Sequence, residues 1–203
     1  MDSLLIATGN RHKTKEISAL LEGKFRVEDL TAHPGYPAIE ESGSTFLENA
    51  RLKAEGISRL HPGLVMADDS GLEVDALGGA PGVRSARFAG ETATDEENLA
   101  LLLQRLRGCQ SRSARFRCVI VLAREGKCLA HFEGACEGRI GESPLGRAGF
   151  GYDPVFIPQG KGETFGELPA EVKNGLSHRG LALGKALAWL EQTFGKTRQS
   201  YPA

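Results

Sequence analysis

The amino-acid sequence predicts an α/β protein with a mixed β-sheet. Apolar runs typical of strands alternate with apolar residues at helical spacing at both ends of the chain. Between these ends, two strand-like runs separated by a short turn predict a β-hairpin. Strand–helix alternation favours parallel pairing and a hairpin is antiparallel, so the two patterns together predict a mixed sheet.

The N-terminal part predicts strand, helix, strand and helix in that order. Residues 4–7 form an apolar run that stops at a polar turn, and apolar residues then recur at helical spacing up to Gly23. A second strand is expected at residues 25–27. Thr45 and Glu48 have the spacing of a capping box, which marks the start of the second helix.

The rest of the chain continues with strands and helices. Residues 64–67 are expected to form a buried strand that ends at Asp68, and Thr94 with Glu97 marks another helix start. The remaining elements are expected at residues 116–123 and 128–135 (the hairpin, turning at Glu125-Gly126), 155–157 (a short strand) and 183–194 (the last helix).

Size and composition fit one folded unit. The chain has 203 residues, of which 40% are hydrophobic and 25% are charged. We therefore expect a single domain over residues 1–203, globular or two-lobed, without a linker and with a loose C-terminal tail at 196–203. The net charge of −1 argues against a protein that binds duplex nucleic acid.

Two features favour a reducing, cytoplasmic setting. The N-terminus has no basic region and too short an apolar run for a signal peptide, and no stretch approaches the roughly 20 apolar residues of a membrane span. The four cysteines have no zinc or redox spacing. Cys118 and Cys128 lie in apolar strand-like runs, which favours a structural role over a redox role.

The first polar cluster lies between the first strand and the first helix. A helix N-terminus attracts phosphate through its free N–H groups and its partial positive charge, and Lys13 would add a full charge. The spacing is not that of a Walker motif. Asn10 as a simple helix cap and Lys13 as a solvated side chain remain equally open. The cluster comprises Thr8, Gly9, Asn10, Arg11, His12 and Lys13.

Carboxylates form the second cluster. Glu40-Glu41 ends a loop, and Asp68-Asp69 follows a buried strand. Magnesium prefers hard oxygen ligands and is usually held by one or two carboxylates together with substrate phosphates. Turn and capping chemistry is the alternative for these aspartates. Asn49 and Lys53 share one helix face, where Lys53 could reach a phosphate or remain a surface lysine.

Two further clusters lie in the C-terminal half. Glycine and aromatic residues alternate at 149–154, which would let a flat base stack or could form only a tight turn. Lys173 and the run Ser177-His178-Arg179-Gly180 gather donors that could read a base carbonyl or touch phosphate. A Ser–His nucleophile is disfavoured because neither Ser70 nor Ser177 lies in a Gly-x-Ser-x-Gly motif.

Together, these clusters resemble the Ham1-like inosine/xanthosine triphosphate pyrophosphatase family. Five stretches match in the order of the family and span nearly the whole chain. They are ATGNRHKTKEI, EESGSTFLENARLKA, ADDSGLEVDALGGAPGVRSARFAG, GFGYDPVFIP and SHRGLAL. One departure is Arg84, which stands where an aromatic residue is common, and which leaves the local substrate contacts open.

The resemblance implies a role for each matching residue. Thr8, Asn10 and Lys13 correspond to the triphosphate grip, and Glu40 and Asp69 correspond to the ligands of Mg²⁺. Asp69 is also the implied proton acceptor, with Ser70 beside the substrate. Whether Glu41 assists Glu40 stays open. The implied nucleobase-binding residues are Phe150, Gly151, Tyr152, Asp153, Lys173, His178 and Arg179.

The resemblance also implies the fold and the reaction. Similar proteins are homodimers of two-lobed α/β subunits around a long mixed sheet. The expected reaction converts aberrant purine nucleoside triphosphates (ITP, dITP and XTP) to the monophosphate and pyrophosphate. A pyrophosphatase for other modified nucleotides and a non-catalytic nucleotide-binding module are the alternatives. The paired carboxylates favour catalysis, because a sensor gains little from acids beside a triphosphate.

Overall fold

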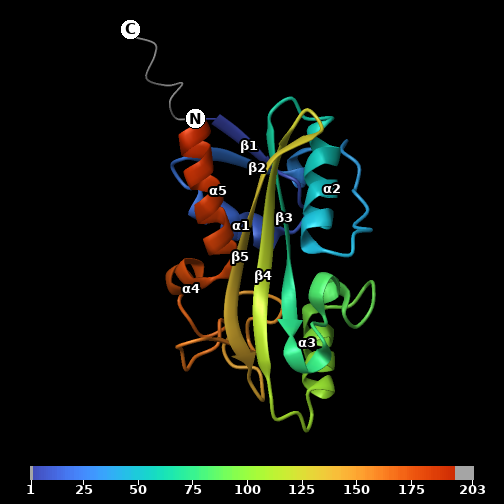
Figure 1. The fold of residues 1–203 in the computed structure, drawn as a ribbon, viewed down its shortest axis with the longest axis vertical. Coiled ribbons are helices and arrows are strands. Elements are labelled where there is room, and N and C mark those ends of the chain that lie inside the picture. Colours follow the sequence, from blue (N-terminus) through green and yellow to red (C-terminus); the bar gives the residue numbers. More distant parts are fainter. Residues whose placement is uncertain (1, 195–203) are drawn as a thin grey trace.

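The structure, a computed structural model, describes residues 2–194. The expected C-terminal tail at 196–203 lies outside the described residues. The centre of the described chain is a six-stranded sheet in the order β2-β1-β3-β4-β5-β6 (Figure 1). The predicted α/β class with a long mixed sheet is thereby confirmed.

The sheet has a parallel half and an antiparallel half that meet at β3. Residues 64–66 of β3 pair in parallel with β1, and residues 65–74 pair antiparallel with β4. The strands are β1 (Asp2–Ile6), β2 (Phe25–Asp29), β3 (Leu64–Val74), β4 (Ser113–Arg124), β5 (Lys127–Ile140) and β6 (Phe156–Pro158). Because β3 belongs to both halves, it places residues of the N-terminal strands beside those of the hairpin.

The helices begin largely where the sequence predicts. Both capping boxes are present, with the side chains of Thr45 and Thr94 accepting from the backbone N–H groups of Glu48 and Glu97. The short helix α4 was not predicted, since seven residues show no helical repeat. The α-helices are α1 (Arg11–Leu20), α2 (Phe46–Ser58), α3 (Asp95–Arg105), α4 (Ala170–Leu176) and α5 (His178–Phe194).

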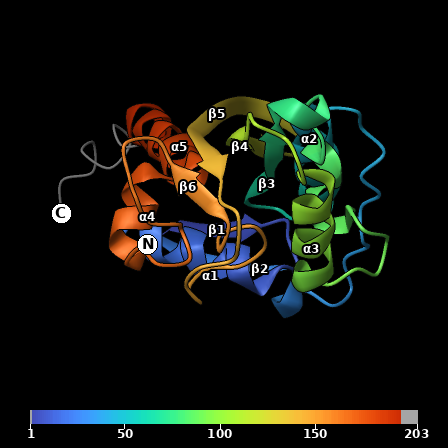
Figure 2. The same ribbon diagram turned by 90° about the horizontal axis from the view of Figure 1, so that it is seen from below.

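Helices cover both faces of the sheet. Side chains alternate between the faces of a strand, so Ile6 and Met66 pack against α1 and α5, whereas Leu5 and Val65 pack against α2. A third group of buried residues, around Phe156, fills the other end of the long strands beside α3. Figure 2 shows α5 and α2 on opposite sides of the sheet, with α3 on the side of α2.

The predicted hairpin joins β4 and β5 through a two-residue turn. Glu125 and Gly126 both have positive φ, at 52° and 75°, as a turn that follows the twist of the strands requires. The N–H of Gly126 donates to Ser58 Oγ at 3.0 Å. The turn is therefore fixed to the C-terminal end of α2.

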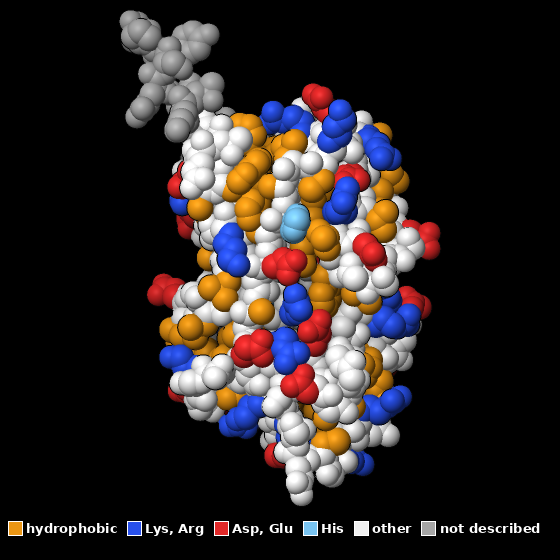
Figure 3. Space-filling view, in the orientation of Figure 1, with side chains coloured by type: hydrophobic (Ala, Val, Ile, Leu, Met, Phe, Trp, Pro, Cys, Tyr) orange, Lys and Arg blue, Asp and Glu red, His pale blue; other side chains and the backbone are white. Residues whose placement is uncertain are grey.

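One face of β5 remains exposed beside α2 and α5. Charged side chains of both signs alternate along the middle of this face (Figure 3). They include ion pairs of Arg115 with Glu137 and of Arg117 with Glu133, each at 3.0 Å. None of the helices within residues 2–194 is long and apolar enough to span a bilayer.

We predict that Gly134→Ala destabilises the fold. Gly134 lies where β5 meets the start of α5, and an added Cβ would lie 2.0 Å from the carbonyl oxygen of His178. Because backbone must move, we expect a loss of at least about 2 kcal/mol in the free energy of unfolding, measured by urea denaturation.

Gly184→Ala is the matched control for that substitution. Gly184 is exposed in α5, the helix that Gly134 contacts, and an added Cβ there would have nothing within 4 Å. Alanine there should stabilise the protein by about 0.5–1 kcal/mol, because it favours the helix. Equal effects of the two substitutions would contradict the close contact of β5 with α5.

Candidate active site

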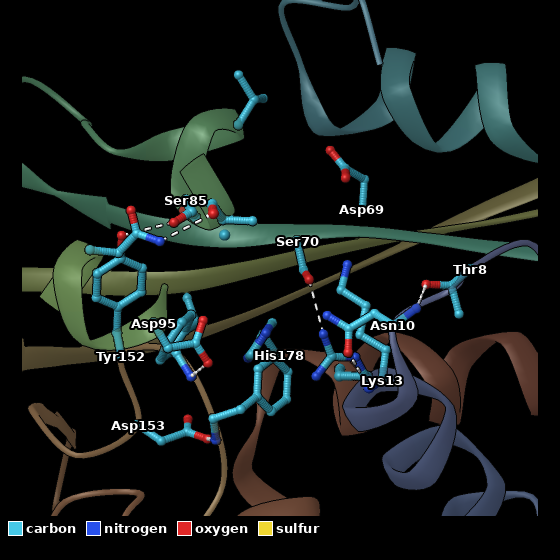
Figure 4. A pocket seen from close by; sticks show the side chains of 18 of the residues that line it. Thr8, Asn10, Lys13, Asp69, Ser70, Ser85, Asp95, Tyr152, Asp153 and His178 are labelled. Carbon is cyan, nitrogen blue, oxygen red and sulfur yellow. Dashed lines mark hydrogen bonds between the residues drawn. The ribbon is translucent and has the colours of Figure 1, made fainter. Parts of the chain in front are cut away.

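A cavity of about 230 Å³ lies beside the middle of β3. Its walls come from the start of α1, the buried face of α2, the 3₁₀ helix Gly82–Arg87, the loop at 149–153 and the helices α4 and α5 (Figure 4). Segments from both ends of the chain therefore meet at one site. Most of the residues singled out in the sequence line this cavity.

The start of α1 forms one end of the cavity. Asn10 Oδ1 accepts from the backbone N–H groups of His12 and Lys13 at 2.9 and 3.2 Å, so Asn10 does cap the helix. Thr8, Asn10 and Lys13 also line the cavity. Lys13 is not a solvated side chain, because its ammonium forms an ion pair with Asp68 and is mostly buried.

The prediction that the third strand ends at Asp68 was wrong. β3 runs on through Asp68-Asp69-Ser70 to Val74. Charged residues are tolerated inside a strand here because each one meets opposite charges or hydrogen-bond donors. Since side chains alternate along a strand, Asp69 and Ser70 project from opposite sides of β3 in Figure 4, and Asp68 shares the side of Ser70.

Asp68 is the fully buried centre of a charged cluster. Arg179 Nε donates to its Oδ2 at 3.1 Å, Cys118 Sγ donates to the same oxygen at 2.9 Å, and Lys13 contacts its Oδ1. Burial alone would raise the pKa of Asp68, but the charges of Arg179 and Lys13 outweigh it and hold the pKa well below 3.8. Asp68 is therefore ionised and structural.

Asp69 and Glu41 form a separate pair of carboxylates below α2. Lys53 Nζ donates to Asp69 Oδ1 at 2.9 Å and to Glu41 Oε1 at 3.1 Å. Burial raises the pKa of Asp69, and the Lys53 charge offsets only part of that effect. For Glu41, burial is outweighed by Lys53 and the pKa is lowered. Glu40, the expected ligand, is exposed and does not line the cavity.

The carboxylate pair fits a hard cation. Asp69 Oδ2 is buried and has no hydrogen-bond partner, so one oxygen remains available for a ligand. Among the described residues, no group of three or more His, Cys, Asp or Glu side chains is placed to hold a metal ion. Two carboxylates with the remaining positions left to water and phosphate match the way proteins bind Mg²⁺.

The loop at 149–153 and the start of α5 form the other end of the cavity. Asp153 Oδ2 accepts from the N–H of Phe150 at 2.8 Å and from Lys173 Nζ at 2.7 Å. Lys173 and Arg179 lie over the Phe150 ring at 5.4 and 5.7 Å. An aromatic face and several donors are thus gathered where a planar base can enter.

His178 is a neutral side chain in this wall. Its ring stacks on Phe116 at 4.7 Å, and its Nδ1 is buried without a partner. Burial lowers the pKa of His178 well below 6.5, and the charge of Arg179 lowers it further. A neutral imidazole offers one donor and one acceptor to a ligand.

Some predicted residues do not line the cavity. Gly9, Arg11, His12 and Glu40 lie outside its wall, although His12 stacks on Phe150 at 5.3 Å. The remaining predicted site residues line it. They are Thr8, Asn10, Lys13, Lys53, Asp69, Ser70, Phe150, Gly151, Tyr152, Asp153, Lys173, His178 and Arg179.

Several residues in and around the cavity wall were missed in the sequence, and two of them, Glu16 and Asp95, tie its elements together. Glu16 bonds Lys173 Nζ at 2.6 Å and also pairs with Arg179, so it joins α1 to α4 and α5. Its position one helical turn after Lys13 was the available signal. Asp95 accepts from the N–H of Gly151 at 2.7 Å and ties α3 to the loop at 149–153. Asp95 is the first residue of a capped helix, where an acidic side chain interacts favourably with the helix dipole. Its position therefore gave no indication of a role in the site.

Comparison with known proteins identifies one family. The model of the Ham1 family matches residues 4–189. The chain is 50% identical to the dITP/XTP pyrophosphatase of Shouchella clausii, covering 90% of this chain and 93% of that protein. It is 48% identical to the dITP/XTP pyrophosphatase of Geobacillus kaustophilus, covering 98% and 99%.

Solved structures show the same similarity. The HAM1 protein from Coxiella burnetii superposes with a TM-score of 0.85 at 39% identity, covering 95% of this chain and 100% of that one. The nucleoside-triphosphatase / dITP/XTP pyrophosphatase from Mycobacterium abscessus superposes with a TM-score of 0.73 at 40% identity, covering 91% and 98%.

We predict that Asp68→Asn destabilises the protein in a pH-dependent way. Removing this carboxylate leaves Arg179 and Lys13 without their buried partner, which should cost about 3 kcal/mol at neutral pH. The folded pKa of Asp68 lies below 3.8, so its stabilising effect is present above that pH and is lost as the pH falls through the folded pKa.

Urea denaturation of both proteins across this range measures the effect. The gap between wild type and variant should shrink by about 1 kcal/mol for each pH unit below 3.8. A gap that stays constant down to strongly acidic pH would mean that the ionised form of Asp68 is not what stabilises the fold.

Proposed function

The chain belongs to the Ham1 family, and we propose that it hydrolyses ITP, dITP and XTP to the monophosphate and pyrophosphate. It acts as a dITP/XTP pyrophosphatase on non-canonical purine nucleotides. One observation carries the proposal. A single cavity joins a carboxylate pair with lysines at one end to an aromatic wall with a neutral imidazole at the other. A nucleoside triphosphate carries a polyphosphate chain at one end and a planar base at the other, which match these two parts of the cavity.

The triphosphate lies towards α1 and α2 in this proposal. Lys13 and Lys53 supply positive charge, and the side chains of Thr8 and Asn10 supply hydrogen-bond groups. The N–H groups of His12 and Lys13 already bond Asn10, so side chains carry most of the grip instead of the helix N-terminus. Each lysine also bonds a carboxylate, which fixes its ammonium before substrate arrives.

We propose Asp69 and Glu41 as the residues that hold Mg²⁺. Glu41 replaces Glu40 in this role because it shares Lys53 with Asp69. Bound Mg²⁺ supplies neutralisation of the charge that grows on the phosphate oxygens as pyrophosphate leaves. Although burial raises the pKa of Asp69, a carboxylate that also binds Mg²⁺ would be a weak base, so we assign Asp69 to orienting the water that attacks the α-phosphorus.

The base lies against Phe150 in this proposal. Hypoxanthine and xanthine present an O6 acceptor and an N1–H donor, and adenine presents the reverse pattern. Lys173 and Arg179 favour a carbonyl oxygen over an amino group, and neutral His178 can meet a donor or an acceptor. Mismatched buried groups would be left unpaired, so adenine nucleotides are rejected by roughly 10⁴-fold.

A product analysis tests the proposed function. The protein is incubated with Mg²⁺ and each of ITP, dITP, XTP, ATP, GTP and dTTP. Pyrophosphate released only from the first three supports the proposal. Orthophosphate would mean cleavage at the γ-phosphate, hydrolysis of dTTP would indicate another modified-nucleotide pyrophosphatase, and binding without hydrolysis would indicate a sensor.

Homodimer formation and a cytoplasmic location are further proposals that rest on the resemblance and on the reaction. Light scattering should give twice the chain mass of 21.7 kDa. A mass of one chain at working concentrations would exclude the homodimer.

We predict that Asp69→Asn loses turnover and keeps nucleotide binding. The amide has the same shape, but it is a poorer ligand for a hard cation and no longer orients water as a carboxylate does. We expect kcat for ITP to fall by at least about 10³-fold, while Kd for ITP changes far less. Retained turnover in a correctly folded variant would exclude Asp69 from the chemistry.

A further inference from the structure

The loop at residues 40–45, here called the carboxylate loop, carries Glu41 to the site without regular secondary structure. Its backbone is held by the first turns of α2. Glu48 Oε2 accepts from the N–H groups of Ser44 and Thr45 at 2.7 and 3.1 Å. The next residue of α2, Asn49, accepts from the N–H of Gly43 at 2.8 Å through Oδ1.

The contact between Gly43 and Asn49 leaves no space for a side chain at position 43. An added Cβ would lie 2.7 Å from Asn49 Oδ1 and 2.6 Å from Glu48 Cβ. Gly43 has no positive φ, so the glycine is required by this close approach and not by backbone conformation. The contact fixes the chain two residues after Glu41.

Asn49 carries a second group that this contact does not use. The side chain is fully buried, and Nδ2 has no hydrogen-bond partner. The assignment of the two amide atoms is fixed, because the N–H of Gly43 requires an acceptor. A buried donor without a partner is unfavourable. If Asn49 were needed only to accept from Gly43, its unpaired Nδ2 would therefore be a cost without a benefit.

The position of Asn49 relates this free donor to the carboxylate pair. Asn49 lies one helical turn before Lys53, on the same face of α2. Lys53 bonds both Glu41 and Asp69, and Asp69 points towards α2 in Figure 4. Asp69 Oδ2 is also a buried atom without a hydrogen-bond partner. A free donor thus lies on the same helix face as Lys53, and a free acceptor belongs to a carboxylate that Lys53 bonds.

We propose that Asn49 is a positioning residue for the carboxylate pair. Oδ1 holds the carboxylate loop through Gly43, and Nδ2 is a donor for an oxygen of the loaded site, either a carboxylate oxygen or water. A donor that gains a partner only when metal and nucleotide are bound stabilises that bound state. Asn49 therefore couples the binding of the metal to the binding of the nucleotide. This inference rests on the proposed function.

Two substitutions separate the two groups of Asn49. Asn49→Ala removes both the acceptor and the donor. Asn49→Asp keeps an acceptor for Gly43 and removes the donor. The added negative charge attracts Mg²⁺, so a weaker metal effect in this variant cannot arise from charge alone.

Ser58→Ala is the matched control on the same helix. Ser58 is buried, and its Oγ accepts from the N–H of Gly126, so it also holds a glycine of a neighbouring loop. Neither Ser58 nor Asn49 lines the cavity, but Ser58 is the last residue of α2 and lies at the other end of the helix from the carboxylate loop. The control therefore loses the same kind of contact far from the carboxylates.

The measurement is the binding of an α,β-methylene analogue of ITP, which cannot be cleaved at the scissile bond. Calorimetric titration gives Kd with Mg²⁺ and with EDTA, and the ratio of the two is the Mg²⁺ coupling. Both Asn49 variants should lose about tenfold or more of the wild-type coupling. Ser58→Ala should lower the melting temperature by about 2–4 °C and leave the coupling unchanged.

Wild-type coupling in either Asn49 variant would overturn the inference, as would an equal loss of coupling in Ser58→Ala. The wild-type protein separates this failure from that of the proposed function. If the wild type shows no Mg²⁺ coupling at all, the proposed metal site and the role of Asn49 fall together. If the wild type shows coupling and the Asn49 variants match it, only the role of Asn49 falls.

Discussion

The buried ion cluster around Asp68 is the interaction on which the arrangement of the site depends. A carboxylate without solvent contact inside a sheet is tolerated only because Arg179, Lys13 and Cys118 all donate to it. These partners come from α5, α1 and β4. The cluster therefore fixes both ends of the chain against the central strand, and the cavity walls have defined positions as a result.

The alternation of β3 divides the two acids between two tasks. Asp68 faces α1 and α5, where surrounding cations keep it ionised and unavailable. Asp69 faces α2, where Lys53 and Glu41 are its neighbours and one oxygen stays free. A shift of one residue in the pairing of β3 with β4 would exchange these faces. The ten-residue antiparallel ladder of residues 65–74 thus specifies which aspartate lines the cavity.

Local patterns predicted the elements better than they predicted the route of β3. Both capping boxes and the hairpin turn depend on residues three or fewer positions apart, so the local sequence is sufficient to predict them. The continuation of β3 through two aspartates depends on Arg179, which lies 111 positions away from Asp68. No local pattern contains such a partner. The family motifs indicated many residues that line the cavity, whereas only the fold of the loop before α2 shows that Glu41 lines it and Glu40 does not.

The charge balance around Lys53 gives a reason why, in the proposed function, the substrate should arrive with its own counter-charge. Lys53 Nζ bonds two carboxylates, Glu41 and Asp69, at 3.1 and 2.9 Å. One cation against two acids leaves this group of three side chains with a net charge of −1 when all are ionised. A triphosphate brings several more negative charges into a partly buried site, where repulsion is stronger than in water. Under the proposed function, Glu41 and Asp69 therefore oppose a bare polyphosphate and favour one that carries a divalent cation, so the same two acids would select the metal-loaded substrate.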